Sequence, residues 1–228
     1  MKGILFKPEM FQAVIEERKT QTRRLGGLKE VNENPDKVIF YGMRTDTEAL
    51  EVLSKPPKGT YACFELPGNN LRFIKPRYQP GEIVYLKEPY LLDASGNVIY
   101  YYNSDVQMQT LAKWKNKMFM PARHARHFIE IVTARPERLQ DITKYDALKE
   151  GVKWDPQFKK YDCYQCLTIR HTGNDICEDG FYSSPRSSFK SLWKSINGEE
   201  SWNKNPWVWV YQFKLLSGKK YKEANNGK

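Results

Sequence analysis

Three side chains with reactive or charged ends lie close together near the start of the chain: Lys19, Thr22 and Arg24. A helix is predicted over residues 8–15, because a proline suits the first turn and the apolar residues after it recur at helical spacing. Residues 20–25 then alternate with a period of two, which predicts a strand with Thr22 and Arg24 on one face. Lys19 lies at the corner between helix and strand. A lysine, a hydroxyl and a guanidinium that converge in this way suit a carbonyl group or an anion as ligand. The alternative is a solvated basic strand.

A fourth candidate, Glu150, comes from the other half of the chain. Thr143 and Asp146 resemble a capping box with a shortened acid, and the helix predicted after them ends at Glu150 and Gly151. The helix macrodipole disfavours an anion at a helix C-terminus. We therefore expect a cation close to Glu150.

Cysteine and histidine residues gather in the segment 163–177, spaced by two, four and five residues. The four candidate metal ligands are Cys163, Cys166, His171 and Cys177. Three thiolates and one imidazole suit a tetrahedral structural zinc ion, which would order this polar segment. A compact zinc knuckle has one residue fewer in the last gap, so reduced cysteines beside a surface histidine are the alternative. Elsewhere, Cys63 is predicted to be a buried thiol, since an intracellular setting disfavours disulfides.

The composition indicates a folded, basic protein. Of the 228 residues, 40% are hydrophobic and 28% charged, and the formal net charge is +10. This charge favours polyanionic partners or small molecules that carry phosphate. The chain has no apolar run long enough to span a bilayer, and its first residues have too short an apolar core for a signal peptide. We therefore expect a cytoplasmic protein without a membrane partner, and no organic cofactor is indicated.

Many short strands and two or three short helices predict an α+β fold, arranged as a small mixed barrel with helices packed over its openings. Further strands are predicted over residues 2–6, 38–41, 61–65, 71–74, 83–86, 97–102, 128–132 and 207–213, and a longer helix over 187–196. Tyr145 and Ile196 are expected on the apolar faces of the two later helices. One domain is predicted over 1–216, with insertions near 28–75 and 153–185. The polar tail over 217–228 is predicted to be disordered.

Three more polar side chains join Arg24 as candidates for substrate binding. Glu88 follows the polar end of the strand predicted over 83–86, whose apolar run suits burial on both faces. Arg123 and His124 belong to a basic cluster that precedes the next predicted strand.

These segments together resemble the ASCH domain, a relative of the PUA RNA-binding barrel. Residues 18–24 after the first helix are similar to the signature of the family, and residues 80–88 to its Gly-Asp-hydrophobic strand. Residues 137–152 resemble the part that follows the middle strands of the barrel. Residues 189–210 resemble the C-terminal part of ASCH-like proteins common in bacteriophages and prophages. The two insertions lie outside the resemblance, which implies a PUA-like barrel.

Small bacterial ASCH proteins include amidohydrolases that remove the acyl group from N-acetylcytidine, and the resemblance implies roles for the matching residues. Lys19, Thr22 and Glu150 match the proposed catalytic lysine, threonine and glutamate, and Arg24 matches an arginine of the family. Glu17 stands where the family has glycine. Thr22 would attack the amide or position a water, and Lys19 would act as base if burial or a cationic neighbour lowers its pKa. A Lys–Glu ion pair with a purely structural role is the alternative.

Three functions remain open at this point. The first is a pocket that binds a modified nucleoside, a nucleotide or RNA and hydrolyses an exocyclic amide. The second is a PUA-like RNA- or DNA-binding module without chemistry. Its phosphate contacts would come from Lys113, Lys115, Lys117, Arg123, His124, Arg126 and His127. The third is a phage structural or anti-defence protein that uses the barrel as a scaffold.

Overall fold

The structure, a computed structural model, describes residues 1–45, 58–165 and 180–216. Over these ranges the protein has a mixed α+β fold, with thirteen strands in four sheets and four α-helices. The predicted α+β class is therefore confirmed. None of the helices in these ranges is long and apolar enough to cross a membrane. Short 3₁₀ helices connect the elements: η1 (Val31–Glu33), η2 (Pro35–Lys37), η3 (Tyr101–Asn103), η4 (Lys117–Phe119), η5 (Ala122–His124), η6 (Leu139–Asp141) and η7 (Glu199–Ser201).

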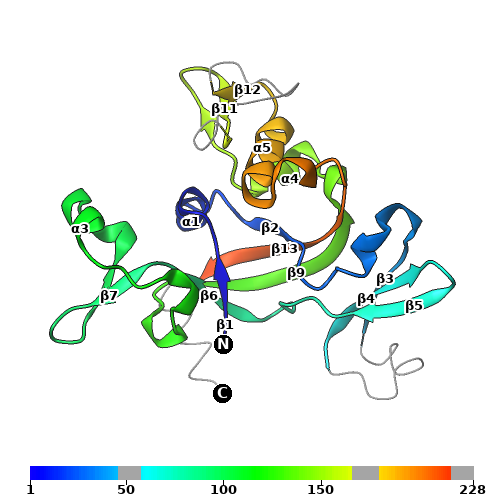
Figure 1. Cartoon of the computed structure of the whole chain (residues 1–228), viewed down its shortest axis with the longest axis horizontal. Helices are drawn as coiled ribbons and strands as arrows, with labels where there is room; N and C mark the ends of the chain where they lie inside the picture. The colour runs from blue at the N-terminus through cyan, green and yellow to red at the C-terminus, as the bar shows by residue number, and fades with distance from the viewer. Residues whose placement is uncertain (46–57, 166–179, 217–228) are drawn as a thin grey trace.

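A five-stranded sheet forms the centre of the molecule (Figure 1). Its order is β1 (Lys2–Leu5), β6 (Ile83–Lys87), β9 (Phe128–Arg138), β13 (Trp207–Leu216) and β2 (Gln21–Arg24). β1 runs parallel to β6, and the other neighbours are antiparallel. Val208, Trp209 and Val210 are all fully buried, so β13 is covered on both faces, as its continuous apolar sequence predicts.

The strand pairing does not close this sheet into a barrel in the described part of the chain, because no ladder joins the edge strands β1 and β2. A side chain links these edges instead. Arg24 Nη2, at the end of β2, donates a hydrogen bond of 2.6 Å to the carbonyl oxygen of Leu5, at the end of β1. A β-bulge between Gln212 and Phe213 adds to the bend of the long strands. The sheet is thus open in the described part of the chain, and the small mixed barrel that we expected is not confirmed.

Three helices pack on the central sheet: α1 (Pro8–Ile15), α4 (Lys144–Lys149) and α5 (Pro185–Asn197). Figure 1 shows α4 and α5 together above the sheet and α1 at the start of β2. The predicted cap of α4 is confirmed, since the Asp146 N–H donates to the Thr143 hydroxyl (3.1 Å). On α5, Phe189, Leu192 and Trp193 are buried in the core.

Two residues expected on apolar helix faces are not buried, and this part of the prediction is wrong. Tyr145 is 73% exposed and Ile196 is 50% exposed. Helix α4 has only six residues, and Ala147 is its buried residue. Ile196 lies in the last turn of α5, just before Gly198 ends the helix. Short helices and helix ends present too few turns for a periodic pattern to decide which side chains are covered.

Each of the two predicted insertions carries a small sheet of its own. The first contains β3 (Ile39–Thr45), β4 (Thr60–Leu66) and β5 (Asn70–Ile74), and the second contains β10 (Trp154–Asp155), β11 (Lys160–Asp162) and β12 (Phe181–Tyr182). β3 overlaps the strand predicted over 38–41, β4 contains the one predicted over 61–65, and the two strands pair in antiparallel orientation. Phe64 on β4 meets Trp207 edge to face, with 5.3 Å between ring centroids, so the first insertion shares the central core.

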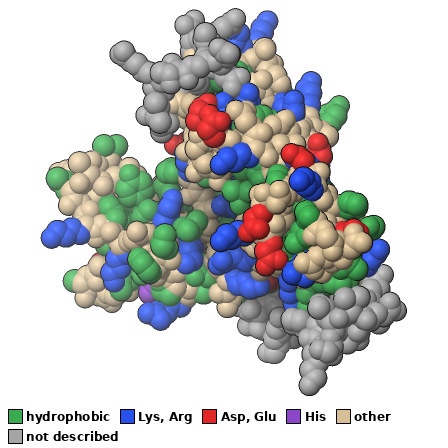
Figure 2. Space-filling model, turned by 45° about the vertical axis from the view of Figure 1, so that its right-hand side comes forward, with side chains coloured by type: hydrophobic (Ala, Val, Ile, Leu, Met, Phe, Trp, Pro, Cys, Tyr) green, Lys and Arg blue, Asp and Glu red, His purple; other side chains and the backbone are tan. Residues whose placement is uncertain are grey.

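A third lobe projects from the other end of the sheet and holds β7 (Tyr90–Leu92), β8 (Val98–Tyr100) and α3 (Val106–Leu111) (Figure 1). The sequence predicted the hairpin strand but not α3, whose apolar side chains Val106 and Leu111 are 78% and 73% exposed. Figure 2, turned by 45° from the view of Figure 1, shows Lys and Arg side chains spread over the visible face of the molecule, with small groups of Asp and Glu between them. The positive charge is therefore not confined to one segment.

Candidate functional site

The turn between α1 and β2 places Lys19 against the end of α4. The Thr20 N–H donates to the carbonyl oxygen of Lys149 (2.9 Å), which joins the two segments. Glu17 has a φ of 57°, in the left-handed region that glycine adopts most easily. Gly151 has a φ of 89°, and a Cβ there would lie only 2.8 Å from Cβ of Lys19. The close approach of Lys19 to α4 thus requires a glycine directly after Glu150.

Lys19 and Glu150 form a buried ion pair. Lys19 Nζ lies 2.8 Å from Glu150 Oε2 and also donates to the Glu150 carbonyl oxygen at 2.7 Å. Both side chains are 3% exposed. Burial lowers the pKa of Lys19, the charge and hydrogen bond of Glu150 oppose this, and Arg24 and Arg23 lower the pKa further. The cation expected near the helix C-terminus is therefore Lys19, and its neutral form is favoured more than in an exposed lysine.

Arg23 completes this ion pair, although the sequence analysis did not select it. Its Nη1 donates to Glu150 Oε1 at 2.9 Å, so each carboxylate oxygen of Glu150 has its own cation. Its Nη2 lies 3.1 Å from Glu137 Oε1 and 3.8 Å from Asp146 Oδ2. Strand alternation put Arg23 on the face away from Thr22, and it did not show that α4 would supply carboxylates there. Arg23 therefore fixes the orientation of the Glu150 carboxylate.

A cavity of about 290 Å³ opens at this ion pair. Its polar lining includes all four residues that we expected in one cleft: Lys19, Thr22, Arg24 and Glu150. Its apolar lining includes Phe6, Met10, Phe189, Leu192 and Trp193. The volume is at the lower end of the roughly 300–1,000 Å³ of small-molecule sites. β2, the α1–β2 corner and the end of α4 thus bring the predicted set together, and α5 forms the opposite wall.

Polar groups on three residues of the cavity lining bear on ligand binding. The Thr22 side chain is buried at the cavity. Arg24 Nε and Trp193 Nε1 are buried donors without a partner among the described groups. A buried donor that makes no hydrogen bond costs about 1–3 kcal/mol, so a ligand oxygen would stabilise either group. Trp193 carries no signal in the sequence beyond its place on an apolar helix face.

The other three residues predicted to bind substrate do not line this cavity. Glu88 is 1% exposed and accepts two hydrogen bonds from Arg126, at 2.7 and 2.8 Å. The Arg126 guanidinium in turn lies over the ring of Tyr100, with 4.1 Å to the centroid. Arg123 and His124 lie on η5 in the same third lobe. Glu88 thus holds the lobe to the end of β6, and its role in substrate binding stays a prediction, as do those of Arg123 and His124.

The structure leaves the zinc prediction without a test. Of the four candidate ligands, only Cys163 lies within the described residues, where it is buried, and Cys166, His171 and Cys177 fall outside them. No group of three or more possible metal ligands occurs in the part of the chain that the structure describes. Cys63 is 6% exposed, as predicted, and burial raises the pKa of its thiol.

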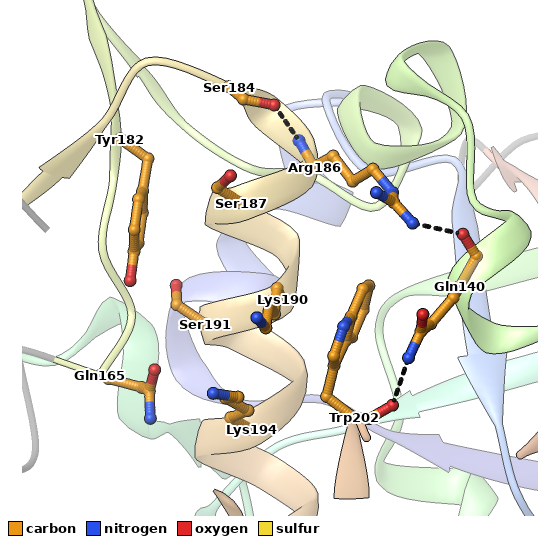
Figure 3. A pocket seen from close by; sticks show the side chains of 10 residues that line it. All are labelled: Gln140, Gln165, Tyr182, Ser184, Arg186, Ser187, Lys190, Ser191, Lys194 and Trp202. Carbon is orange, nitrogen blue, oxygen red and sulfur yellow. Dashed lines mark hydrogen bonds between the residues drawn. The ribbon is translucent and has the colours of Figure 1, made fainter. Parts of the chain in front are cut away.

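A second cavity, of about 410 Å³, lies on the other side of α5 (Figure 3). Its lining from α5 includes Arg186, Lys190 and Lys194. Figure 3 shows Arg186 donating to the carbonyl oxygen of Gln140 at 2.6 Å, while the Gln140 amide donates to the carbonyl oxygen of Trp202 at 2.9 Å. The first bond joins α5 to the segment at Gln140, and the second joins that segment to the chain that follows α5.

Comparison of the chain with protein-family models, with curated proteins and with solved structures finds no match. The chemistry of the site therefore follows from its geometry. A lysine with a lowered pKa, a hydroxyl and a carboxylate that holds the lysine are the components of acyl-transfer chemistry on a threonine. The cations nearby can stabilise an oxyanion.

Proposed function

We propose that the protein is an ASCH-like amidohydrolase that removes an acyl group from the exocyclic nitrogen of a cytosine base. One observation carries the proposal. Lys19, Thr22 and Glu150, the residues that match the catalytic set of the resembling family, line one cavity together with Arg24. The curved sheet, whose edges are joined by Arg24 and Leu5, supports the further proposal that the fold is a PUA-like barrel left open between β1 and β2.

The proposed reaction begins with proton transfer from the Thr22 hydroxyl to the neutral form of Lys19, whose population the lowered pKa of this lysine increases. The Thr22 oxygen then attacks the carbonyl carbon of the amide, and the positive charges that line the cavity stabilise the oxyanion that forms. Lys19 returns the proton to the departing exocyclic nitrogen, which leaves the acyl group on Thr22 as an ester. A water molecule, deprotonated by Lys19, hydrolyses this ester to the free acid and regenerates the hydroxyl. In the alternative version, Thr22 positions a water that attacks the amide directly.

Glu150 has a positioning role in this scheme. It holds the Nζ of Lys19 through its side chain and its carbonyl oxygen, so the lysine has one orientation with respect to the cavity. A carboxylate next to the base also stabilises the lysine when it carries the transferred proton. The apolar side chains of Met10 and Leu192 offer a surface for the methyl group of an acetyl substituent.

The proposal is tested by turnover. Purified protein should release acetate from N-acetylcytidine, detected by chromatography of the cytidine product. Thr22→Ala should abolish release, and Thr22→Ser, which keeps a hydroxyl, should retain part of the rate. Because both substitutions leave the backbone pairing of β2 with β13 intact, both variants should fold normally. Equal rates for the wild type and Thr22→Ala would refute the role of Thr22.

A second function, nucleic-acid binding without chemistry, is favoured by one surface of the third lobe. Phe119 is 77% exposed, and Lys113, Lys115 and Arg123, which lie within six residues of it in the sequence, are also exposed. Exposed aromatic rings among cations can stack on bases and contact phosphates. If this surface alone is used, Phe119→Ala should weaken binding of single-stranded RNA, and the wild type should hydrolyse no acylated nucleoside.

A further inference from the structure

The cavity next to Lys19 contains far more positive than negative charge. Five cationic side chains line it, and Glu150 is the one carboxylate among the described residues of the lining. The cations are Lys7, Lys19, Arg23, Arg24 and Lys117. Two of them, Lys19 and Arg23, are compensated by Glu150 and by the carboxylates behind Arg23. The charges of the remaining three cations determine which charged groups of a ligand the cavity can bind.

Lys7, Arg24 and Lys117 are held by neutral oxygens and not by carboxylates in the described structure. Lys7 Nζ donates to the carbonyl oxygen of Ser195 at 2.9 Å and to its hydroxyl at 3.0 Å. Arg24 Nη2 donates to the Leu5 carbonyl oxygen at 2.6 Å, and Lys117 Nζ donates to that of Phe6 at 2.8 Å. A carbonyl dipole satisfies a donor, but it does not neutralise a charge that has lost its water.

The three cations converge on one short stretch of backbone. The acceptors of Arg24 and Lys117 are consecutive residues, Leu5 and Phe6, and Lys7 is the next residue in the chain. Helix α1 begins directly after Lys7, and no side chain caps its N-terminus. The positive end of the helix dipole therefore lies at this stretch of backbone. Met10, in the first turn of α1, also lines the cavity.

The balance of nearby charges supports an anion at this point. Burial lowers the pKa of Lys117, and the charge of Glu9, in the exposed first turn of α1, opposes this. Burial likewise lowers the pKa of Arg24. In both cases burial outweighs the carboxylate that opposes it, Glu150 for Arg24 and Glu9 for Lys117. A bound anion would restore the stability of their charged forms.

We propose that Lys7, Arg24, Lys117 and the N-terminus of α1 form a phosphate-binding subsite. The substrate of the cavity is then a nucleotide or a nucleic-acid residue and not a neutral nucleoside. This inference rests on the proposed function for the position of the base, and it adds the chemical class of the substrate. A phosphate monoester carries roughly −1.5 to −2 charges at pH 7, which matches the uncompensated cations better than a single carboxylate does. The Phe6 ring lies close to a cation of each proposed subsite: its centroid is 5.7 Å from Nζ of Lys19, the catalytic lysine, and 5.1 Å from the guanidinium of Arg24, in the phosphate subsite.

The test is a calorimetric comparison of products, which are not turned over. The wild type is titrated at low salt with cytidine, with cytidine 5′-monophosphate and with a cytidine dinucleotide. Charge-assisted hydrogen bonds of this kind should make the monophosphate bind about tenfold or more tightly than cytidine. Lys7→Met and Lys117→Met, on different elements, should each reduce this preference, while Lys29→Met, an exposed lysine outside the cavity, should not.

The outcomes separate this inference from the proposed hydrolysis. Equal affinity for cytidine and its monophosphate, with no thermal shift from inorganic phosphate, would overturn the phosphate subsite even if N-acetylcytidine is hydrolysed. A phosphate preference that Lys117→Met removes would support the subsite even if no amide is hydrolysed. Tighter binding of the dinucleotide than of the monophosphate would support the subsite and identify a nucleic-acid strand as the source of the phosphate. Raising the salt concentration should weaken the preference in every case.

Discussion

Replacement of Lys19 by methionine separates a catalytic from a structural role for the buried ion pair. Methionine keeps most of the apolar stem but removes Nζ and its two hydrogen bonds to Glu150, of 2.7 and 2.8 Å. Removal of one partner of a buried ion pair costs about 3–5 kcal/mol when the other charge is left alone. Here Arg23 still compensates Glu150, so we expect a loss of about 1–3 kcal/mol in the free energy of unfolding. Hydrolysis should fall by about 10²–10⁴-fold, the usual contribution of a general base.

The assay combines urea unfolding with turnover of N-acetylcytidine. Lys149→Met is the matched control, because Lys149 is an exposed lysine at the end of α4, directly before Glu150. Its replacement should change the free energy of unfolding by less than about 0.5 kcal/mol. A folded Lys19→Met protein with the full rate would refute the role of Lys19 as base. A variant that loses several kcal/mol, but whose folded fraction turns over normally, would show that Lys19 is a structural tether.

The pH dependence of stability gives a second signature of Lys19. Its pKa is lowered in the folded protein, whereas the unfolded chain has the ordinary lysine value of about 10.4. Between the lowered value and about 10.4, the unfolded state binds more protons, so stability rises with pH across this window. Urea unfolding of Lys19→Met should lack this rise. An identical pH dependence in the two proteins would mean that the ammonium is not destabilised by burial.

Three further changes test the packing around the site and the third lobe. Gly151→Ala should cost about 2–4 kcal/mol in urea unfolding, because it combines a φ of 89° with a contact of 2.8 Å to Lys19 Cβ. Glu88→Gln should cost about 2–4 kcal/mol, measured in the same way, since it leaves Arg126 without its carboxylate. Burial and the charge of Arg126 lower the pKa of His127 to about 4, so the unfolded state takes up this proton first and stability falls from about pH 6.5 to pH 4. His127→Gln should reduce that fall in the free energy of unfolding by up to about 2 kcal/mol after allowance for solvent screening. For each of the three variants, an unfolding free energy equal to that of the wild type under the stated conditions would contradict the assignment.

The elements that carry the candidate site were predictable because their signals are local. The first helix needed only Pro8 and an apolar face, and it begins and ends at the predicted residues. Thr143 and Gly151 likewise marked the start and the end of α4, and these two signals in the sequence were enough to place Glu150 at a helix C-terminus. The macrodipole argument then correctly required a nearby cation.

The site residues and contacts that the sequence did not predict depend on packing between segments that are far apart in the chain. Arg23 looked like the outward-facing residue of an exposed strand, and only the packing of α4 on β2 shows that it binds Glu150. Glu88 looked like a ligand-binding acid at a strand end, because the sequence does not show that Arg126 would reach it. Trp193 and Lys117 enter the cavity from α5 and from the third lobe, far from Lys19 in sequence. Neither periodicity nor turn chemistry reports such long-range contacts.

The most direct measurement of the central claim is a crystal structure of Lys19→Met soaked with N-acetylcytidine 5′-monophosphate, which this variant should bind but not hydrolyse. We predict that the base occupies the cavity of about 290 Å³, with its acyl carbonyl within hydrogen-bond reach of the Thr22 hydroxyl. The phosphate should lie at Lys7, Arg24, Lys117 and the start of α1. A ligand bound instead in the cavity on the outer side of α5, or on the exposed surface around Phe119, with the cavity beside Thr22 and Glu150 left empty, would contradict the account.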